Sequence, residues 1–226
     1  MSGFRWRHFC GEVILWAVRW YCRYGVSYRD LKEMLHERGV EVDQRYAPEL
    51  EKRLAWYRSR LSFSWRVDET YVKVKDRWRY LYRAIDKNGA TLDFHLSQRR
   101  NMEAAKRFLG AALKRAHGCI PRVISTDKNP AYGDAIAALK KEGTLPPYVE
   151  HRQAKYFNNR LEADHGQLKR RIRPTLGFKS MRSARATITG FEIMRMFRKG
   201  QFRFWIECVG GGTEVRFIAR LFGLQA

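Results

Sequence analysis

The chain has 226 residues and a formal net charge of +22 at neutral pH, with 45% hydrophobic and 14% aromatic residues. That much apolar material supports a folded core, which excludes a disordered basic tail as the source of the charge. A folded protein with so large a surplus of positive charge usually binds a polyanion, and nucleic acid is the first candidate. Because no apolar run approaches the roughly 20 residues that span a bilayer, we expect no membrane partner.

Targeting and redox features are not evident in the sequence. The stretch VILWAVRWYC at 13–22 continues into RYGVSYRD rather than into small residues, which argues against a secretory signal. The four cysteines lie far apart and form no C-x-x-C pair, so a zinc or redox site has no support. We therefore expect a cytoplasmic protein with reduced thiols.

Two helices are predicted near the N-terminus. Apolar residues at helical spacing mark the first over 12–24. Ser27 caps the second, with Asp30 as the reciprocal acid, and that helix ends near Gly39. The pair resembles the start of a helix-turn-helix, although any small helical hairpin fits the pattern as well. Pro48 opens a third helix so soon afterwards that little room is left for a complete recognition helix.

Strands dominate the middle of the chain. Three antiparallel strands are predicted over 65–74, 77–86 and 90–97, and Asn88-Gly89 supplies the turn between the last two. A helix, a strand, a helix and a fifth strand follow, over 101–117, 122–126, 130–142 and 148–152. This is the element order of the ribonuclease H-like fold, an α/β architecture with a mixed five-stranded sheet flanked by helices. Two further helices are predicted over 158–173 and 180–199.

Three acids in these elements are candidates for chemistry. Asp68 lies inside the first strand, Asp127 follows the fourth, where ligands bind in open α/β sheets, and Glu162 lies on a helix 35 positions later. Clustered carboxylates repel one another unless divalent cations neutralise them, and hard oxygen ligands favour Mg²⁺ or Mn²⁺. Two such ions can activate a nucleophile and stabilise a leaving oxygen. Solvated surface acids are the alternative, and helical geometry does not separate Glu162 from Asp164.

Longer motifs resemble a known family. The runs WRVDETYVKV, STDKNPAYGDAI, NNRLEADHGQLKRRI and TLGFKSMRSARATITGFEIMRMFRKGQ are similar to those of the DDE transposases of the insertion-sequence-six family. The resemblance covers about residues 12 to 202. The residues that match the family's catalytic and metal-binding acids are Asp68 rather than Glu69, Asp127, and Glu162 rather than Asp164. Glu69 is expected to point to the other face of the strand and to form an ion pair.

The resemblance implies a DNA transposase with an integrase-type catalytic core, which cleaves strands and transfers them at the terminal inverted repeats of a bacterial insertion sequence. It implies two Mg²⁺ or Mn²⁺ ions as cofactors, and element ends and target DNA as partners. An N-terminal DNA-binding region is expected at 1–62, a catalytic domain at 63–202 and an interaction element at 203–226, where the pattern is unclear. Synapsis of two ends implies a homodimer or larger assembly, working in the cytoplasm at the nucleoid.

Basic residues supply the predicted DNA contacts. Residues 151–200 contain 13 lysines or arginines against three acids, and a DNA track beside metal-binding acids fits them better than a solvated helix face. Lys169 resembles the family's basic residue seven positions after the glutamate, roughly 10 Å along the helix. The predicted DNA-binding residues are Lys169, Arg170, Arg171, Arg173, Lys179, Lys128, Asn159, Arg29 and Lys32. Aromatic residues in RWRYLYR at 77–83 suggest base stacking, but core packing is their expected use.

The N-terminal helical region departs from the family and is shortened. Asp43 meets Gln44 directly, where family members carry about eight more residues, roughly two helical turns that include the recognition helix. Losing that helix removes most base-edge contacts, whereas the carboxylate site is complete. Two alternatives stay open: a noncatalytic or defective DNA-binding copy, and a metal-dependent nuclease that cleaves without joining.

Overall fold

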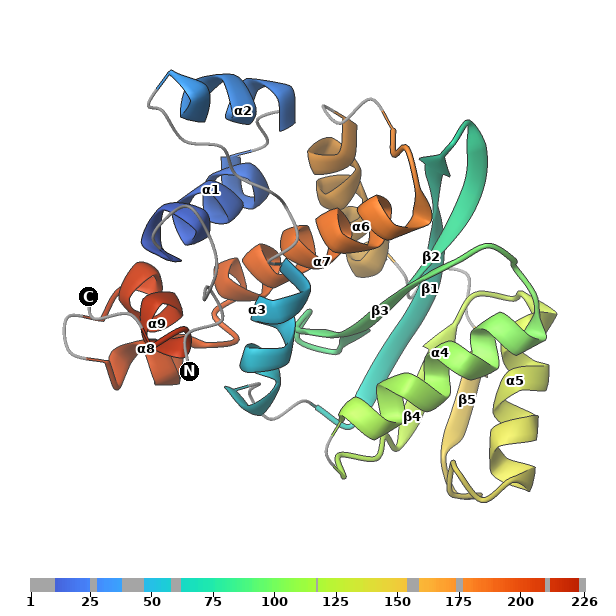
Figure 1. The fold of residues 1–226 in the computed structure, drawn as a ribbon. Coiled ribbons are helices and arrows are strands. Elements are labelled where there is room, and N and C mark those ends of the chain that lie inside the picture. The colour runs from blue at the N-terminus through green and yellow to red at the C-terminus, as the bar shows by residue number, and fades with distance from the viewer. Residues whose placement is uncertain are drawn as a thin grey trace. The chain divides into compact units, whose positions relative to one another are not determined.

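The computed structural model describes most of the chain, and its helices and strands are drawn in Figure 1. The residues described are 11–24, 28–37, 47–57, 62–116, 118–153, 159–173, 177–209 and 212–223. The chain packs as two compact units. We call Arg60–Gln167 the sheet unit, and Met1–Ser59 together with Leu168–Ala226 the helical unit.

The sheet unit is built on a mixed five-stranded sheet. Its strands are β1 Ser64–Val74, β2 Arg77–Asp86, β3 Thr91–Ser97, β4 Val123–Thr126 and β5 Glu150–Gln153. Its helices are α4 Met102–Arg115, α5 Pro130–Lys141 and the first part of α6 Asn159–Ile172. The strands lie in the order β3-β2-β1-β4-β5, with β2 antiparallel to β1 and β3, and β4 parallel to β1 and β5. The predicted ribonuclease H-like architecture is confirmed.

The two hairpins of the sheet close with different turn residues. Gly89 adopts φ 91°, a left-handed conformation that glycine reaches without steric cost, so the predicted Asn88-Gly89 turn joins β2 to β3. Between β1 and β2, Lys75 and Asp76 have φ 48° and 58°, although neither is glycine. This two-residue connection has the positive φ values of a type I′ turn, whose twist matches that of the flanking strands.

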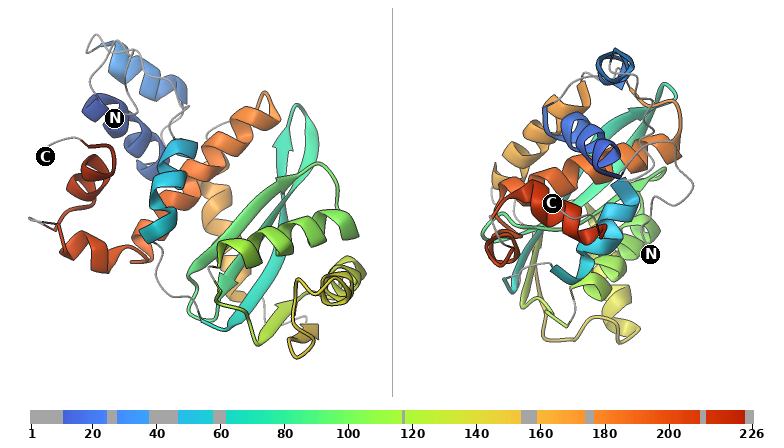
Figure 2. Two further views of the ribbon diagram at one scale, coloured as in Figure 1. Left: turned by 60° about the horizontal axis from the view of Figure 1, so that its bottom comes forward. Right: turned by 60° about the vertical axis from the view of Figure 1, so that its left-hand side comes forward.

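Helices α4 and α5 lie side by side and pack on one face of the sheet (Figure 2). Each begins at an asparagine, Asn101 or Asn129, whose side chain accepts a hydrogen bond from an N–H of the first helical turn. The core beneath them is rich in aromatic rings. The ring centroid of Tyr82 on β2 lies 5.8 Å from that of Phe108 on α4 and 6.2 Å from that of Tyr132 on α5. These contacts fix both helices relative to the central strands.

The helical unit is formed by two separate stretches of the chain. Its elements are α1 Gly11–Tyr24, α2 Tyr28–His36, α3 Ala47–Leu54 with a 3₁₀ turn at Ala55–Tyr57, α7 Met181–Arg198, α8 Arg203–Glu207 and α9 Glu214–Leu221. The last residues of α6, from Leu168 onward, also belong to it. α7 begins in a capping box of Ser180 and Ser183, is buried along most of its length, and contacts α1 and α3. α7 is therefore the centre of this unit.

Helices α8 and α9 occupy a segment whose sequence carries no clear pattern. Glu214 at the start of α9 pairs with Arg19 at 3.0 Å and with Arg23 at 2.6 Å, so α9 is tied to α1. Phe217 and Phe222 are buried within the same unit. Their apolar surface is thus covered inside the chain.

Helices α1 and α2 form as the sequence predicts. The region expected to have lost its recognition helix, with the junction of Asp43 and Gln44, falls in 38–46, outside the described residues. Of the helices that the structure describes, none is long and apolar enough to cross a membrane.

Candidate active site

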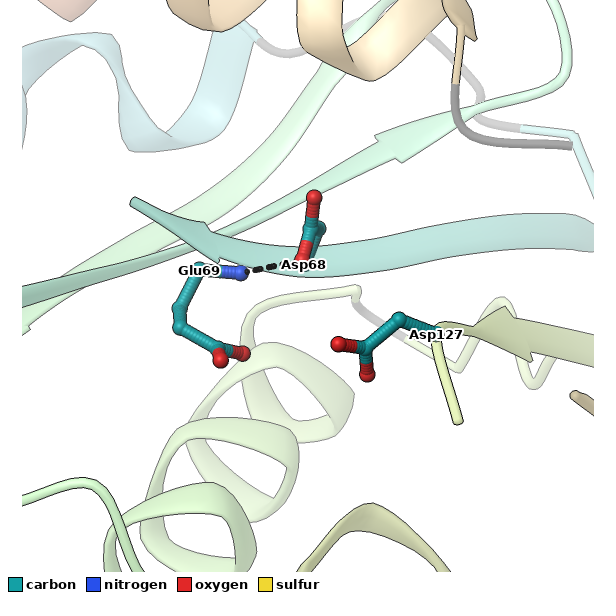
Figure 3. A group of neighbouring side chains, drawn as sticks. All are labelled: Asp68, Glu69 and Asp127. Atoms are coloured by element: carbon teal, nitrogen blue, oxygen red, sulfur yellow. Dashed lines mark hydrogen bonds between the residues drawn. The ribbon is translucent and has the colours of Figure 1, made fainter. Parts of the chain in front are cut away.

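Asp68 and Asp127 come from adjacent parallel strands. β1 pairs with β4 in a register that matches Arg66 with Ser125, so Asp68 lies level with Asp127, just past the end of β4. Asp68, Glu69 and Asp127 each offer an oxygen atom, and these atoms all lie within 4.8 Å of one another (Figure 3). The structure therefore brings two of the three predicted acids together, and Glu69 joins them.

Local hydrogen bonds hold both aspartates. The N–H of Glu69 donates to Oδ1 of Asp68 at 2.9 Å. The N–H of Asn129 donates to Oδ1 of Asp127 at 3.1 Å, while the Asn129 side chain caps α5 and Pro130 opens that helix. The sequence DKNP thus fixes the Asp127 carboxylate where strand β4 gives way to helix α5.

Glu69 is buried, whereas both aspartates are partly exposed. Its side chain leaves β1 on the side opposite to that of Asp68 (Figure 3). The Glu69 carboxylate accepts hydrogen bonds from Nε of Arg100 and from the hydroxyl of Tyr132, and Nδ2 of Asn129 lies 3.5 Å away. Glu69 therefore forms the expected ion pair, and it connects β1 to α5 and to the residue that precedes the α4 cap.

Arg100 places a positive charge at the edge of this acidic cluster. Its Nη2 lies 3.8 Å from Oδ2 of Asp127, and its side chain is 37% exposed. Burial lowers the pKa of Arg100, but the attraction and hydrogen bond of Glu69 outweigh it, so the pKa lies above its ordinary value. Burial and the charge of Glu69 raise the pKa of Tyr132 well above its ordinary value, which keeps its hydroxyl protonated as a donor. Sequence reasoning missed Arg100, because two arginines directly before a helix cap look like a solvated charge run.

The third predicted acid, Glu162, lies on α6. Its backbone belongs to this helix, and its side chain lies outside the described part of the structure. Asp164 is buried and pairs with the guanidinium of Arg83, which is fully buried on β2. Arg83 lies opposite Asp68 in the β1–β2 register, so the two side chains share one face of the sheet. Of the two acids that helical geometry left open, Asp164 is engaged in this ion pair.

The predicted DNA-binding residues fall on both units. In the sheet unit, Lys128 is exposed directly after Asp127. Four exposed residues of the helical unit are Lys169, Arg170, Arg173 and Lys179. Arg171 is half-buried and donates to the backbone carbonyl of Arg23, and burial lowers the pKa of Arg171. Three more have helical backbones and side chains that lie outside the described part: Asn159, Arg29 and Lys32.

The donor atoms of the cluster suit a hard divalent cation. Carboxylate oxygens are the ligands that Mg²⁺ and Mn²⁺ prefer, whereas nitrogen and sulfur suit zinc. In the part of the chain that is described, the cluster contains only carboxylates. Within this cluster Glu69 is buried and bound by Arg100 and Tyr132, whereas Asp68 and Asp127 are partly exposed at the sheet edge.

Comparison with known proteins decides the family. A family model described as a DDE domain matches residues 62–201. Over 210 residues the chain is 38% identical to the transposase for the insertion sequence-like element IS431mec of Staphylococcus aureus, covering 89% of this chain and 91% of that protein. The chain belongs to the insertion-sequence-six family of DDE transposases. The transposase for insertion sequence element IS257 in transposon Tn4003, also of S. aureus, is 37% identical over the same shares.

Solved structures similar to this transposase include the HTLV-2 integrase catalytic core domain in complex with magnesium, in its trimeric form. The identity is 17% and the TM-score 0.44, with 59% of this chain and 86% of that chain covered. Family membership makes this protein a DNA transposase and a polynucleotidyl transferase, which binds DNA and depends on a divalent metal. It favours neither a noncatalytic copy nor a nuclease without joining activity.

Proposed function

We propose that Asp68, Asp127 and Glu162 form the catalytic triad of this transposase and hold two cations, Mg²⁺ or Mn²⁺. The observation that carries the proposal is the meeting of Asp68 and Asp127 on adjacent parallel strands, within the 4.8 Å cluster. The ion pair of Asp164 with Arg83 supports Glu162, because it engages the competing acid. It also brings α6 to the face of the sheet that carries Asp68.

The reaction is phosphoryl transfer without a covalent protein intermediate. At an element end, a water oxygen attacks phosphorus while the bond to the 3′-oxygen breaks, which leaves a 3′-hydroxyl and a 5′-phosphate. The oxygen of that hydroxyl then attacks a phosphorus of the target strand, whose own 3′-oxygen leaves, so joining makes one phosphodiester for each that it breaks. The cations, when bound, neutralise charge and activate the attacking oxygen. Arg100, beside Asp127, adds a fixed positive charge at the same edge.

The DNA partners are the inverted repeats of the element and the target. The exposed cations Lys169, Arg170 and Arg173 contact phosphates, which gives affinity without sequence information. End recognition belongs to residues 1–62 and catalysis to 63–202, with 203–226 as an interaction element. Two ends are brought together by a homodimer or a larger assembly on DNA, in the bacterial cytoplasm at the nucleoid.

Strand transfer with purified protein tests the triad. A labelled duplex carrying the repeats of its own element is incubated with target plasmid and Mg²⁺, and wild type is compared with Asp127→Asn and Glu162→Gln. We expect joined products only from wild type. Titration calorimetry with Mn²⁺ gives a readout independent of turnover, and both variants should bind the ion more weakly. Asp134→Asn, which alters an exposed acid of α5, is the matched control and should keep both properties.

A variant with eight residues inserted after Asp43 distinguishes an active transposase from a copy that has lost its recognition helix and from a nuclease. Joined products from the inserted form alone would mean that the site is sound and that this copy lost its recognition helix. Cleavage without joined products would identify a nuclease. Full activity of Glu162→Gln would overturn the triad as proposed.

A further inference from the structure

The tip of the β1–β2 hairpin carries aromatic rings on one face. Tyr71 and Lys73 lie on the same side of β1 and pair across the hairpin with Tyr80 and Trp78 of β2. We call these four residues the hairpin face. Trp78 is 61% exposed and Tyr71 is 45% exposed, and their rings meet edge to face with centroids 6.3 Å apart. Tyr71 also lies 5.4 Å from Tyr80 between ring centroids, so the rings form a continuous surface.

Core packing, the expected use of the aromatic residues in RWRYLYR, holds for Tyr82 and fails for Trp78. Tyr82 is buried against Phe108 and Tyr132. Trp78 lies at the start of β2 next to the turn, where most of its indole stays in water. Because the Trp78 ring is so exposed, its burial contributes little to the stability of the fold. A ring that is held on a strand with one side open can, however, stack on another ring.

The charges near the hairpin face indicate what covers it. Between Tyr71 and Tyr80 the cations are Lys73, Lys75, Arg77 and Arg79, and the single acid, Asp76, pairs with Lys73 at 3.0 Å. Arg77 and Arg79 alternate to the other side of β2 from Trp78 and Tyr80, so it is the hairpin tip as a whole that carries a surplus of three positive charges. A second copy packed here by two-fold symmetry would set these cations against their own images, which is unfavourable. Nucleic acid offers flat bases for the rings and phosphates for the cations, so it matches both features at once.

The hairpin face also lies next to the carboxylates. Tyr71 follows Glu69 by two residues on the same side of β1, a separation of about 7 Å. Tyr71 is one of the groups that raise the pKa of Arg100, and Arg100 itself binds Glu69 and lies beside Asp127. DNA held at the carboxylates therefore has this surface within reach of the neighbouring nucleotides.

We propose that the hairpin face stacks on unpaired DNA bases next to the strand end that is cut or joined. The position of that end rests on the proposed function of the carboxylates. Bases in a duplex keep their faces within the base stack, so only unpaired or terminal bases offer a face to Trp78 and Tyr71. The role assigned to this surface is to hold the strand end after it leaves the duplex.

Binding of single-stranded DNA in EDTA tests the proposal without strand cleavage. The probes are a fluorescein-labelled oligodeoxythymidine and a second strand of equal length whose central bases are replaced by abasic sites, read by anisotropy. Trp78→Ala should weaken binding of the intact strand about ten-fold or more. It should leave binding of the abasic strand unchanged, because the phosphates are the same. Wild type should itself prefer the intact strand.

Two further variants serve as controls for ring stacking and for general surface effects. Trp78→Phe preserves a ring and should keep most of the affinity, and circular dichroism confirms that each variant is folded. Tyr148→Ala removes a side chain that is 68% exposed elsewhere in the sheet unit, and should bind both strands as wild type does.

Three results would overturn the proposal. Trp78→Ala could bind the intact strand as tightly as wild type does, or it could lose the same affinity for the intact and the abasic strand. It could also keep its DNA binding but no longer form a dimer that wild type forms in analytical sedimentation. The last would place a second copy on the hairpin face. The binding assay contains EDTA and so does not depend on metal-dependent catalysis. If wild type failed to join DNA in the separate strand-transfer assay, that result would count against the proposed function and not against base stacking.

Discussion

At the scale of single residues, the ion pair of Asp164 with Arg83 lies almost wholly out of water, with side chains 10% and 0% exposed. Desolvating two charges costs several kcal/mol for each, and their close contact in a region of low dielectric offsets that cost. Glu150 and Arg152 also form an ion pair, but their side chains are 53% and 57% exposed. Water and salt screen such a surface pair, so the two pairs differ in what their loss should cost.

Asp164→Ala should therefore lower the free energy of unfolding of the sheet unit by about 3 kcal/mol, because Arg83 stays buried with one carboxylate fewer. Glu150→Ala is the matched control and should lower the free energy of unfolding far less, because water and salt screen that pair. Urea denaturation followed by circular dichroism measures both variants. Equal losses would show that burial adds nothing to the importance of the Asp164 pair.

The residue scale also shows how far the site follows from sequence. Asp68 and Asp127 were predictable as neighbours, because a strand interior and the carboxyl end of a parallel strand are set by local pattern. The cluster with Glu69 was not predictable, because strand alternation assigns Glu69 to the opposite face. Its longer side chain still reaches the others, and its partners Arg100 and Tyr132 come from distant positions that only the packed structure brings together.

At the scale of elements, the β1–β2 turn combines a regular shape with residues that do not favour it. Lys75 and Asp76 both have positive φ, where a β-carbon crowds the backbone at a cost of roughly 1–2 kcal/mol for each residue. Asparagine enters this region more readily than lysine, and it is favoured in type I′ turns.

Lys75→Asn should accordingly raise the free energy of unfolding by about 0.5 kcal/mol or more, measured by urea denaturation. Lys87→Asn, at an exposed lysine in the β2–β3 turn that does not have positive φ, should bring no gain. A Lys75→Asn protein no more stable than wild type would mean that the turn is not strained by its side chains.

Elements were predictable where local chemistry decides them. The Asn88-Gly89 turn, for example, is decided by residues within a few positions. The exposure of Trp78 was not, since the alternation that buries Tyr82 continues unchanged along β2. Whether a ring is covered depends on where α4 and α5 lie, and that is settled by packing between elements.

At the scale of the whole molecule, the charge of +22 makes phosphate binding the main source of affinity for DNA. Each phosphate contact contributes about 0.9 to the slope of log affinity against log salt. The triple variant Lys169→Ala, Arg170→Ala, Arg173→Ala should therefore reduce that slope by nearly three on random duplex DNA, measured by anisotropy across a salt series.

The control for the salt series uses cations already matched by acids. Arg152 and Arg203 are bound to Glu150 and Glu207 at 2.7 and 2.8 Å. Replacing both with alanine removes positive charge from the surface without removing the proposed contacts, so the slope should hardly change. An equal fall in the two variants would mean that total charge, rather than the end of α6, sets the affinity.

The two units differ in when they can be completed during synthesis. The sheet unit is one continuous stretch, finished before Leu168 and the residues after it are translated, whereas the helical unit combines residues from before and after that stretch. Helix α1 is translated before the sheet unit, whereas Glu214, the partner of Arg19 and Arg23, is translated after it. A ribosome that stops after Gln167 would therefore release a chain that contains the whole sheet unit but lacks α7 and α9, which both contact α1.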